Sequence, residues 1–326
     1  MEYIVKPKIG FIGAGNVSEH HIKAAKDNGF DLYGICGRNG SLNAKKMAEK
    51  YNFKYYWKSI DLIDINELDA ISIIVDPANL IKIYRKFEKT NLAILIEKPV
   101  ALQSRKINSL NNKRSKTMVA FNRRYYSSVK QFKQSISNLE YFQGHANLSE
   151  LSWNLHSTNK EKIETLKSNG IHYFDLLIYL FGKPKSINFT GISATGRIFG
   201  GSCIINFEDN KIITLNVNFG IPNNHSLEVY SGNIILRLKP LEIFSKTVGM
   251  KTESIGKSKN KSYVPSLENA WKLSKQDITY KAGFFEMYKA FYRITKNDCG
   301  LNFPSISDAK QALELAENIE KLLELK

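Results

Sequence analysis

The chain has 326 residues, of which 43% are hydrophobic and 24% are charged. These proportions are those of an ordinary globular protein, and they exclude a disordered or fibrous chain. The length exceeds what one hydrophobic core usually serves, so two domains are expected. The formal net charge of +16 leaves three kinds of partner to weigh: a nucleic acid, a membrane surface and an anionic small substrate.

The lysines behind this charge are scattered singly, with only short clusters such as residues 257–261. No recognisable nucleic-acid module accompanies them, and the longest apolar runs are far shorter than the roughly 20 residues that span a bilayer. The first residues lack the features of a signal peptide, and three widely spaced cysteines form no CxxC pair. We therefore expect a cytoplasmic protein with a solvated basic surface, without a nucleic-acid partner, a membrane partner or a metal.

Short apolar runs alternate with segments of helical spacing through the first third of the chain. This alternation predicts a doubly wound parallel sheet of the α/β class. The expected strands cover residues 8–12, 32–36, 70–75, 92–96 and 117–121, and the expected helices cover residues 19–28, 43–51, 78–89 and 105–112.

After residue 121 longer alternating runs with turn punctuation begin, which are typical of antiparallel strands. They predict a C-terminal α+β domain with an open, largely antiparallel sheet, whose uncovered face would mediate homo-oligomer contacts. The domains would be 1–121 and 122–326, with the last helix a candidate to pack back on the first domain. The expected strands cover residues 142–153, 186–192, 202–207, 211–219 and 226–238, the helices residues 127–137, 170–181 and 307–325, and a loop residues 251–262.

The first expected strand is followed by Gly13-Ala14-Gly15-Asn16-Val17-Ser18, a GxGxxG pattern with serine in the third place. The first glycine permits a tight turn, the second lets a pyrophosphate approach the backbone, and the third place needs only a small residue. The helix that follows offers free backbone N–H groups to phosphates. Between a strand and a helix, this loop predicts a Rossmann dinucleotide site.

The end of the second expected strand bears on the choice of cofactor. A carboxylate there would bind the 2′-hydroxyl of the adenosine ribose, but Asp31 stands at the start of the strand instead. The strand ends in Gly37-Arg38-Asn39, where an arginine could meet a 2′-phosphate or stack on adenine. The sequence therefore favours NADP(H), with NAD(H) as the alternative.

Four landmarks in order along the chain resemble the Gfo/Idh/MocA family, the relatives of glucose-fructose oxidoreductase and inositol dehydrogenase. The loop GAGNVSEHH keeps the family's histidine as His21, and residues 97–99 read EKP. Residues 121–125 read FNRRY, and residues 170–175 read GIHYFD, similar to the family's GxHxxD segment.

By this resemblance Lys98 lies beside the nicotinamide and the reacting carbon, and His172 is the acid or base. A histidine, or a lysine with a lowered pKa, suits the removal of a hydroxyl proton as hydride leaves for the cofactor. His21 is expected to be structural. The candidate cofactor-binding residues are Gly13, Gly15, Asn16, Val17, Arg38, Asp76, Glu97 and Lys98, and the candidate substrate-binding residues are Lys98, Arg123, Asp175 and His172.

Two departures from the family pattern stand out. Ser168 replaces the acidic residue that many members carry four positions before the histidine, and a sugar-nucleotide branch also lacks this acid. Asp76-Pro77-Ala78 replaces the usual Thr-Pro after the fourth strand. Arg123 and Arg124 are candidates either to anchor an anionic substrate or to hold the domain junction.

The resemblance implies an NAD(P)-dependent oxidoreductase that acts on a hydroxyl or keto carbon of a sugar or sugar nucleotide, with a place in sugar metabolism or polysaccharide biosynthesis. A second hypothesis is a redox-silent dinucleotide-binding sensor or regulator of the same fold. Retention of both Lys98 and His172 favours the enzyme.

Overall fold

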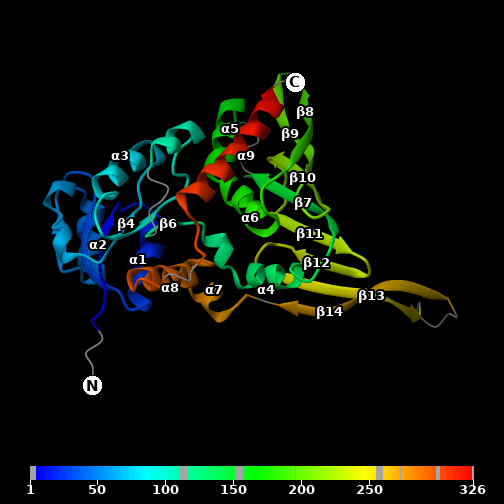
Figure 1. The fold of residues 1–326 in the computed structure, drawn as a ribbon, viewed down its shortest axis with the longest axis horizontal. Helices are drawn as coiled ribbons and strands as arrows, with labels where there is room; N and C mark the ends of the chain where they lie inside the picture. The colour runs from blue at the N-terminus through cyan, green and yellow to red at the C-terminus, as the bar shows by residue number, and fades with distance from the viewer. Residues whose placement is uncertain are drawn as a thin grey trace. The chain divides into compact units, whose positions relative to one another are not determined.

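The computed structural model describes residues 5–110, 116–150, 157–194, 196–254, 260–271, 273–298 and 302–324. It divides into two compact units (Figure 1). Unit 1 contains the residues up to Tyr125 together with Lys275–Glu314, and unit 2 contains Tyr126–Ser274 together with the residues from Leu315 onward. The predicted boundary after residue 121 places residues 275–306 in the second domain and leaves the last helix a candidate to pack back on the first, whereas the structure groups all of Lys275–Glu314 with the first unit.

Unit 1 is built on a six-stranded parallel sheet with the order β3-β2-β1-β4-β5-β6. Its inner strands β4 and β5 are buried along their whole length, as expected where helices cover both faces. The predicted Rossmann sheet is confirmed, and the short edge strand β3 was missed. The strands are β1 (Lys8–Ile12), β2 (Asp31–Cys36), β3 (Tyr55–Trp57), β4 (Ala70–Ile73), β5 (Ala93–Ile96) and β6 (Thr117–Val119).

The first three helices of unit 1 follow the predicted pattern, but the described part of the segment expected as a helix over 105–112 is a 3₁₀ helix. Residues 111–112 of that prediction lie outside the described residues. The α-helices are α1 (Ser18–Asp27), α2 (Leu42–Tyr51), α3 (Pro77–Phe87), α7 (Lys275–Thr279) and α8 (Phe284–Thr295). The 3₁₀ helices are η1 (Ile60–Leu62), η2 (Ile65–Glu67), η3 (Ser104–Ser109) and η4 (Asn122–Tyr125).

Helix α8 explains why the late segment belongs to unit 1. Its side chains Phe284, Met287, Tyr288 and Phe291 are buried in the same core as β1 and α1. Phe291 also stacks on Phe30, with ring centroids 5.8 Å apart. Such buried aromatic area contributes a large share of core stability, so the hydrophobic core of unit 1 is completed by residues far away in sequence.

Unit 2 is built on an eight-stranded sheet with the order β14-β13-β12-β11-β7-β10-β9-β8. All neighbours are antiparallel except β7 and β10, which are parallel, so the predicted largely antiparallel sheet is confirmed. The strands are β7 (Phe142–Glu150), β8 (Ser186–Ala194), β9 (Arg197–Asn206), β10 (Lys211–Phe219), β11 (Ser226–Ser231), β12 (Ile234–Leu238), β13 (Phe244–Ser254) and β14 (Lys261–Trp271).

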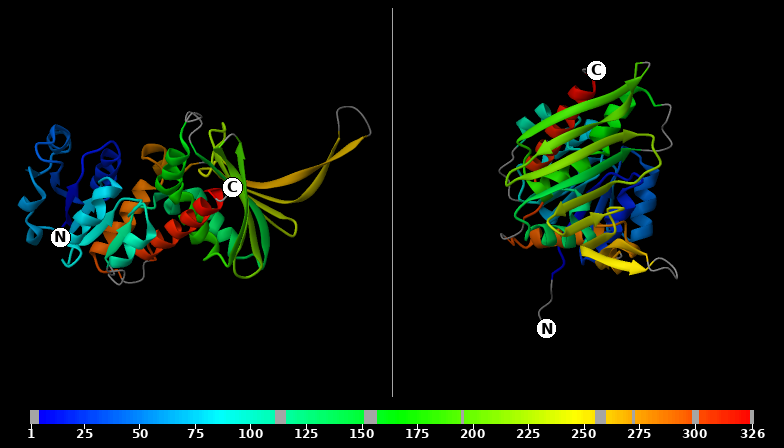
Figure 2. Two further views of the ribbon diagram at one scale, coloured as in Figure 1. Left: turned by 90° about the horizontal axis from the view of Figure 1, so that it is seen from above. Right: turned by 90° about the vertical axis from the view of Figure 1, so that its right-hand side faces the viewer.

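One face of this sheet carries the helices of unit 2, and within the described ranges no helix covers the other face (Figure 2). Helix α6 is the most apolar, and all its residues except Tyr179 are buried. The helices are α4 (Ser127–Ile136), α5 (Asn159–Ser168), α6 (Ile171–Phe181) and the second part of α9 (Ile306–Glu324), whose first part groups with unit 1. None of the described helices has the length and apolar character needed to cross a membrane.

Two predictions for this half of the chain need correction, and one helix was missed. The stretch 226–238 is a hairpin of β11 and β12 that turns at Gly232, where φ is 52°. Residues 251–262 were predicted as a loop, but residues 251–254 belong to β13 and residues 261–262 to its partner β14, whereas 255–259 lie outside the described residues. Helix α5 was missed, and residues 151–153 of the strand predicted over 142–153 are also outside the described ranges.

Candidate active site

The glycine loop begins with a position that only glycine can fill. Gly13 has a φ of 113°, and a Cβ built there would lie 1.8 Å from the carbonyl oxygen of Ile74. Its N–H donates a hydrogen bond of 2.8 Å to the carbonyl oxygen of Cys36. The loop is therefore fixed between the ends of β2 and β4 by close backbone contact.

Gly15 differs from Gly13 because its missing side chain leaves open space. A Cβ built at Gly15 has no atom within 4 Å. Helix α1 begins just beyond, at Ser18, and no side chain caps its N-terminus at Val17. The Ser18 N–H donates to the carbonyl oxygen of Gly15 and the His20 N–H to that of Val17, each at 3.1 Å. What this end of the helix offers an anion is therefore chiefly the positive end of the helix dipole. Asn16, next to Gly15, is exposed.

A cavity of about 450 Å³ lies at this end of the unit 1 sheet. The loops after β1, β2 and β4 form it, as expected for ligands at the carboxyl ends of parallel strands. Four of the predicted cofactor residues, Gly13, Gly15, Arg38 and Asp76, line it, whereas Asn16, Val17, Glu97 and Lys98 do not. The other lining residues, which the sequence did not single out, are Ile12, Ala14, Gly37, Ser41, Ile60, Ile74, Val75, Asn79 and Ile83.

An ion pair joins two of the cavity residues that were predicted separately. Nη2 of Arg38 lies 3.0 Å from Oδ2 of Asp76, and the two side chains are 86% and 68% exposed. Asp76 is also the residue that precedes the first turn of α3, with Pro77 in its first position. Such an exposed pair adds little to stability, so both groups can rearrange around a ligand. Asp31 is the first residue of β2, as the sequence predicted.

Glu97 and Lys98 follow the last residue of the buried strand β5, so they emerge at the same sheet edge as the glycine loop. The Lys98 N–H donates to Oε2 of Glu97 at 2.9 Å, and Oε1 lies 2.8 Å from Nε2 of His21. Burial alone would raise the pKa of Glu97, but His21 and Lys98 outweigh it and hold this pKa below its usual range. The carboxylate is therefore charged and held from both sides.

His172 and Asp175 lie one helical turn apart at the start of α6 in unit 2. The histidine is 9% exposed and the aspartate 1% exposed. The His172 N–H donates to the carbonyl oxygen of Asn169 at 3.2 Å. Tyr173 is fully buried, and its hydroxyl donates to the carbonyl oxygen of Ser226 at 2.5 Å. Lys98 belongs to unit 1 and His172 to unit 2, so the joint action of these two residues stays a prediction.

The two arginines of the FNRRY segment have different surroundings in η4. Arg124 is 5% exposed, and its Nη2 lies 3.3 Å from Oδ1 of Asp308, within unit 1. Arg123 is half-buried, and its buried Nη1 has no hydrogen-bond partner among the described residues. Arg124 thus has a structural partner inside its own unit, and Arg123 retains capacity to bind an anion.

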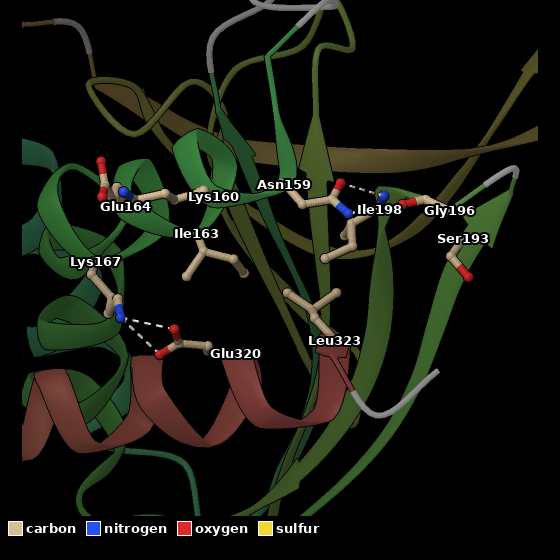
Figure 3. A pocket seen from close by; sticks show the side chains of 10 residues that line it. All are labelled: Asn159, Lys160, Ile163, Glu164, Lys167, Ser193, Gly196, Ile198, Glu320 and Leu323. Atoms are coloured by element: carbon tan, nitrogen blue, oxygen red, sulfur yellow. Dashed lines mark hydrogen bonds and ion pairs between the residues drawn. The ribbon is translucent and has the colours of Figure 1, made fainter.

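A second cavity, of about 510 Å³, lies in unit 2 among α5, the ends of β8 and β9, and α9 (Figure 3). Nζ of Lys167 lies 2.8 and 2.9 Å from the two carboxylate oxygens of Glu320. The Ile198 N–H donates to Oδ1 of Asn159 at 2.9 Å. None of the predicted site residues lines this cavity, and these polar groups already satisfy one another.

Comparison with known proteins identifies the family of the N-terminal part of the chain. Residues 7–125 match the family model described as "Oxidoreductase family, NAD-binding Rossmann fold". These residues belong to the Gfo/Idh/MocA family. The resemblance read from the glycine loop and the EKP segment is thereby confirmed, and residues 7–125 match an oxidoreductase family described as NAD-binding.

Solved structures of this fold match both units of the chain. UDP-N-acetylglucosamine 3-dehydrogenase GnnA from Acidithiobacillus ferrooxidans is 14% identical, with a TM-score of 0.75 and 99% of each chain covered. A levoglucosan dehydrogenase in complex with NADH and levoglucosan is 15% identical, with a TM-score of 0.76 and 98% of each chain covered. A putative myo-inositol dehydrogenase from Sinorhizobium meliloti 1021 is 18% identical, with a TM-score of 0.71 and 98% of each chain covered. No curated protein sequence matches the chain.

Proposed function

We propose that this protein is an NAD(P)-dependent oxidoreductase that transfers a hydride between the nicotinamide and a hydroxyl or keto carbon of a sugar or sugar nucleotide. The proposal rests on what lies at the carboxyl ends of neighbouring parallel strands in unit 1. The glycine loop and the Lys98 backbone both begin there, and the cavity lies at the same end of the sheet. This is where ligands of such sheets bind.

The geometry of the cavity supports the binding of a dinucleotide. Gly13 holds the tight turn, Gly15 leaves room for a pyrophosphate, and the start of α1 presents the positive end of its helix dipole. Arg38 and Asp76 would meet the adenosine ribose. When bound, a nicotinamide dinucleotide supplies the hydride chemistry.

Lys98 and His172 would handle the proton of the reacting hydroxyl group. In the oxidation direction an imidazole nitrogen of His172 takes that proton as the carbonyl forms, and Lys98 orients the oxygen through a hydrogen bond. In reduction the same imidazole returns the proton. Asp175, on the same face of α6 one turn later, would bind a second substrate hydroxyl.

A sugar nucleotide is the substrate class that we favour. Ser168 agrees with the branch of the family that lacks the acid, and the buried Nη1 of Arg123 could bind a phosphate oxygen. Among the similar structures, one is a UDP-N-acetylglucosamine 3-dehydrogenase and another binds levoglucosan. The two free cysteines that the described residues contain, Cys36 and Cys203, agree with a place in the reducing cytoplasm.

The open face of the unit 2 sheet would be the contact surface of a homo-oligomer. Along β9 and β10 buried residues alternate with outward-facing ones, among them Ile204 and Ile212, which are 47% and 42% exposed. Between these strands Ser202 donates to Asn216 at 2.6 Å. A half-apolar face with internally satisfied polar groups suits burial against a second copy.

A screen of sugar nucleotides and free sugars against NAD(H) and NADP(H), followed at the nicotinamide absorbance band, tests the function. The proposal expects an absorbance change with at least one sugar nucleotide. The second candidate, a redox-silent sensor, would bind a dinucleotide and give no absorbance change with any member of the screen. That result would reject the proposed oxidoreductase.

A further inference from the structure

Four buried polar side chains of unit 1 form one hydrogen-bonded chain that ends on Glu97. The hydroxyl oxygens of Ser72 and Tyr288 lie 3.0 Å apart, and the Tyr288 hydroxyl lies 3.0 Å from Nδ1 of His21. Nε2 of His21 lies 2.8 Å from Oε1 of Glu97. Ser72, Tyr288 and His21 are completely buried, and the Glu97 side chain is 11% exposed.

The chain joins four separate elements of unit 1. Ser72 belongs to β4, Tyr288 to α8, His21 to α1, and Glu97 follows β5. The His21 ring is further fixed by the edge of Phe284, with ring centroids 4.9 Å apart. Each hydrogen-bonding group is thus held by packing as well as by its partner.

The donors can be arranged in one direction along the chain. Because Glu97 is a carboxylate, both its oxygens accept, one from the Lys98 N–H and the other from Nε2–H of His21. Nδ1 of His21 then accepts from Tyr288, which in turn accepts from Ser72. Burial raises the pKa of Tyr288 far above its ordinary value, so the tyrosine remains a hydroxyl donor.

We infer that His21, Tyr288 and Ser72 are positioning residues that fix the Glu97 carboxylate and, through it, the backbone of Lys98. The inference rests on the proposed function in that Lys98 is there the residue that touches substrate. It assigns a role in the site to helix α8, which no site motif of the sequence includes.

An entirely structural role would not require this arrangement. A buried polar chain adds little net stability over apolar groups of the same shape, whereas leaving one member without its partner is costly. The chain ends on the carboxylate that accepts the Lys98 N–H, at the edge where the cofactor cavity lies. If the Glu97 carboxylate became more mobile, the backbone of Lys98 would therefore lose its fixed position first.

The test compares Tyr288→Phe with Tyr84→Phe. Tyr84 is a matched control because it is also completely buried in unit 1, and its hydroxyl lies 3.3 Å from Oγ1 of Thr117. One readout is hydrogen–deuterium exchange of the Lys98 amide by NMR. The other is kcat, KM and dinucleotide Kd with the substrate found in the screen.

We expect Tyr288→Phe to speed Lys98 amide exchange and to lower kcat by about tenfold each, with dinucleotide Kd and KM nearly unchanged. Tyr84→Phe should alter neither readout. His21→Gln, whose amide can still donate to Glu97, should retain more activity than His21→Ala. If Tyr288→Phe fails to fold, Ser72→Ala removes only the far end of the chain and should shift the exchange rate in the same direction.

Equal behaviour of Tyr288→Phe and Tyr84→Phe in Lys98 exchange would overturn the inference. The same holds for His21→Gln and His21→Ala variants that are equally impaired. If the native protein shows no turnover with any sugar, the proposed function fails, but the exchange measurement still decides whether the chain positions Lys98.

Discussion

Replacing Gly15 by valine separates dinucleotide binding from folding. A Cβ at Gly15 meets no atom within 4 Å, so the substitution should change the free energy of unfolding by less than about 0.5 kcal/mol. The added side chain would occupy the space into which the pyrophosphate must come. Loss of about two charge-assisted hydrogen bonds, at about 1.5–3 kcal/mol each, should raise the dinucleotide Kd at least about 100-fold.

The assay is titration of the cofactor's fluorescence, with thermal unfolding measured on the same samples. Gly13→Ala is the contrasting variant, because its Cβ would lie 1.8 Å from the Ile74 carbonyl oxygen at a φ of 113°. It should destabilise unit 1 by about 3 kcal/mol or more. Unchanged titration by a folded Gly15→Val protein would refute the assignment of this loop to a pyrophosphate.

Three further predictions concern cofactor choice, assembly and acid stability. Arg38→Ala should weaken NADP(H) binding about tenfold while sparing NAD(H), and Asp76→Asn should strengthen NADP(H) because it releases Arg38 from the 3.0 Å ion pair; equal effects on both cofactors in calorimetric titrations would contradict this. Ile204→Asp should convert an oligomer to a monomer in light scattering at micromolar concentration, and a monomeric native protein would reject the proposed contact surface. The Glu97 pKa is lowered from its ordinary value of 4.5, so at a pH above 4.5 the ionised carboxylate stabilises unit 1. This contribution to stability is lost as the pH falls through the lowered pKa. The difference in Tm between native protein and Glu97→Gln should therefore shrink below pH 4.5, and a pH-independent difference would count against it.

The parts of the fold that follow from local sequence could be predicted. The apolar run 8–12, closed by Gly13, could only be a buried strand entering a tight turn, and the structure has β1 there. The strongly apolar segment 170–181 likewise predicted helix α6. In both segments the secondary structure is set by residues close together in sequence, so the spacing of hydrophobic residues is enough to predict it.

The parts that depend on distant partners could not be predicted. Residues 251–262 are polar and rich in lysine and serine, so they carry no strand pattern, and the pairing of β13 with β14 shows only in three dimensions. Helix α8 carries a buried apolar face, but its place against α1 depends on contacts across more than half of the chain. Tyr288 for that reason gave no signal as a partner of His21.

The candidate site divides in the same way. Gly13, Gly15 and Arg38 were found from spacing along one strand–turn–helix unit, and they line the cavity. Asp76 was noted only as a departure from the family pattern, and its ion pair with Arg38 could not be foreseen because 38 positions separate the two. Ser41 has a local signal, since a serine before a helix is a common cap, and its Oγ accepts from the Ala44 N–H.

Steady-state turnover of Lys98→Ala and His172→Ala, with the sugar nucleotide that the screen identifies, tests the central claim most directly. The account predicts that each variant loses about 100-fold to 10,000-fold in kcat and keeps its dinucleotide Kd. The exposed residues Lys82 and His145 supply matched controls, because Lys82→Ala and His145→Ala should leave kcat unchanged. Native-like turnover by either Lys98→Ala or His172→Ala would contradict the proposed chemistry.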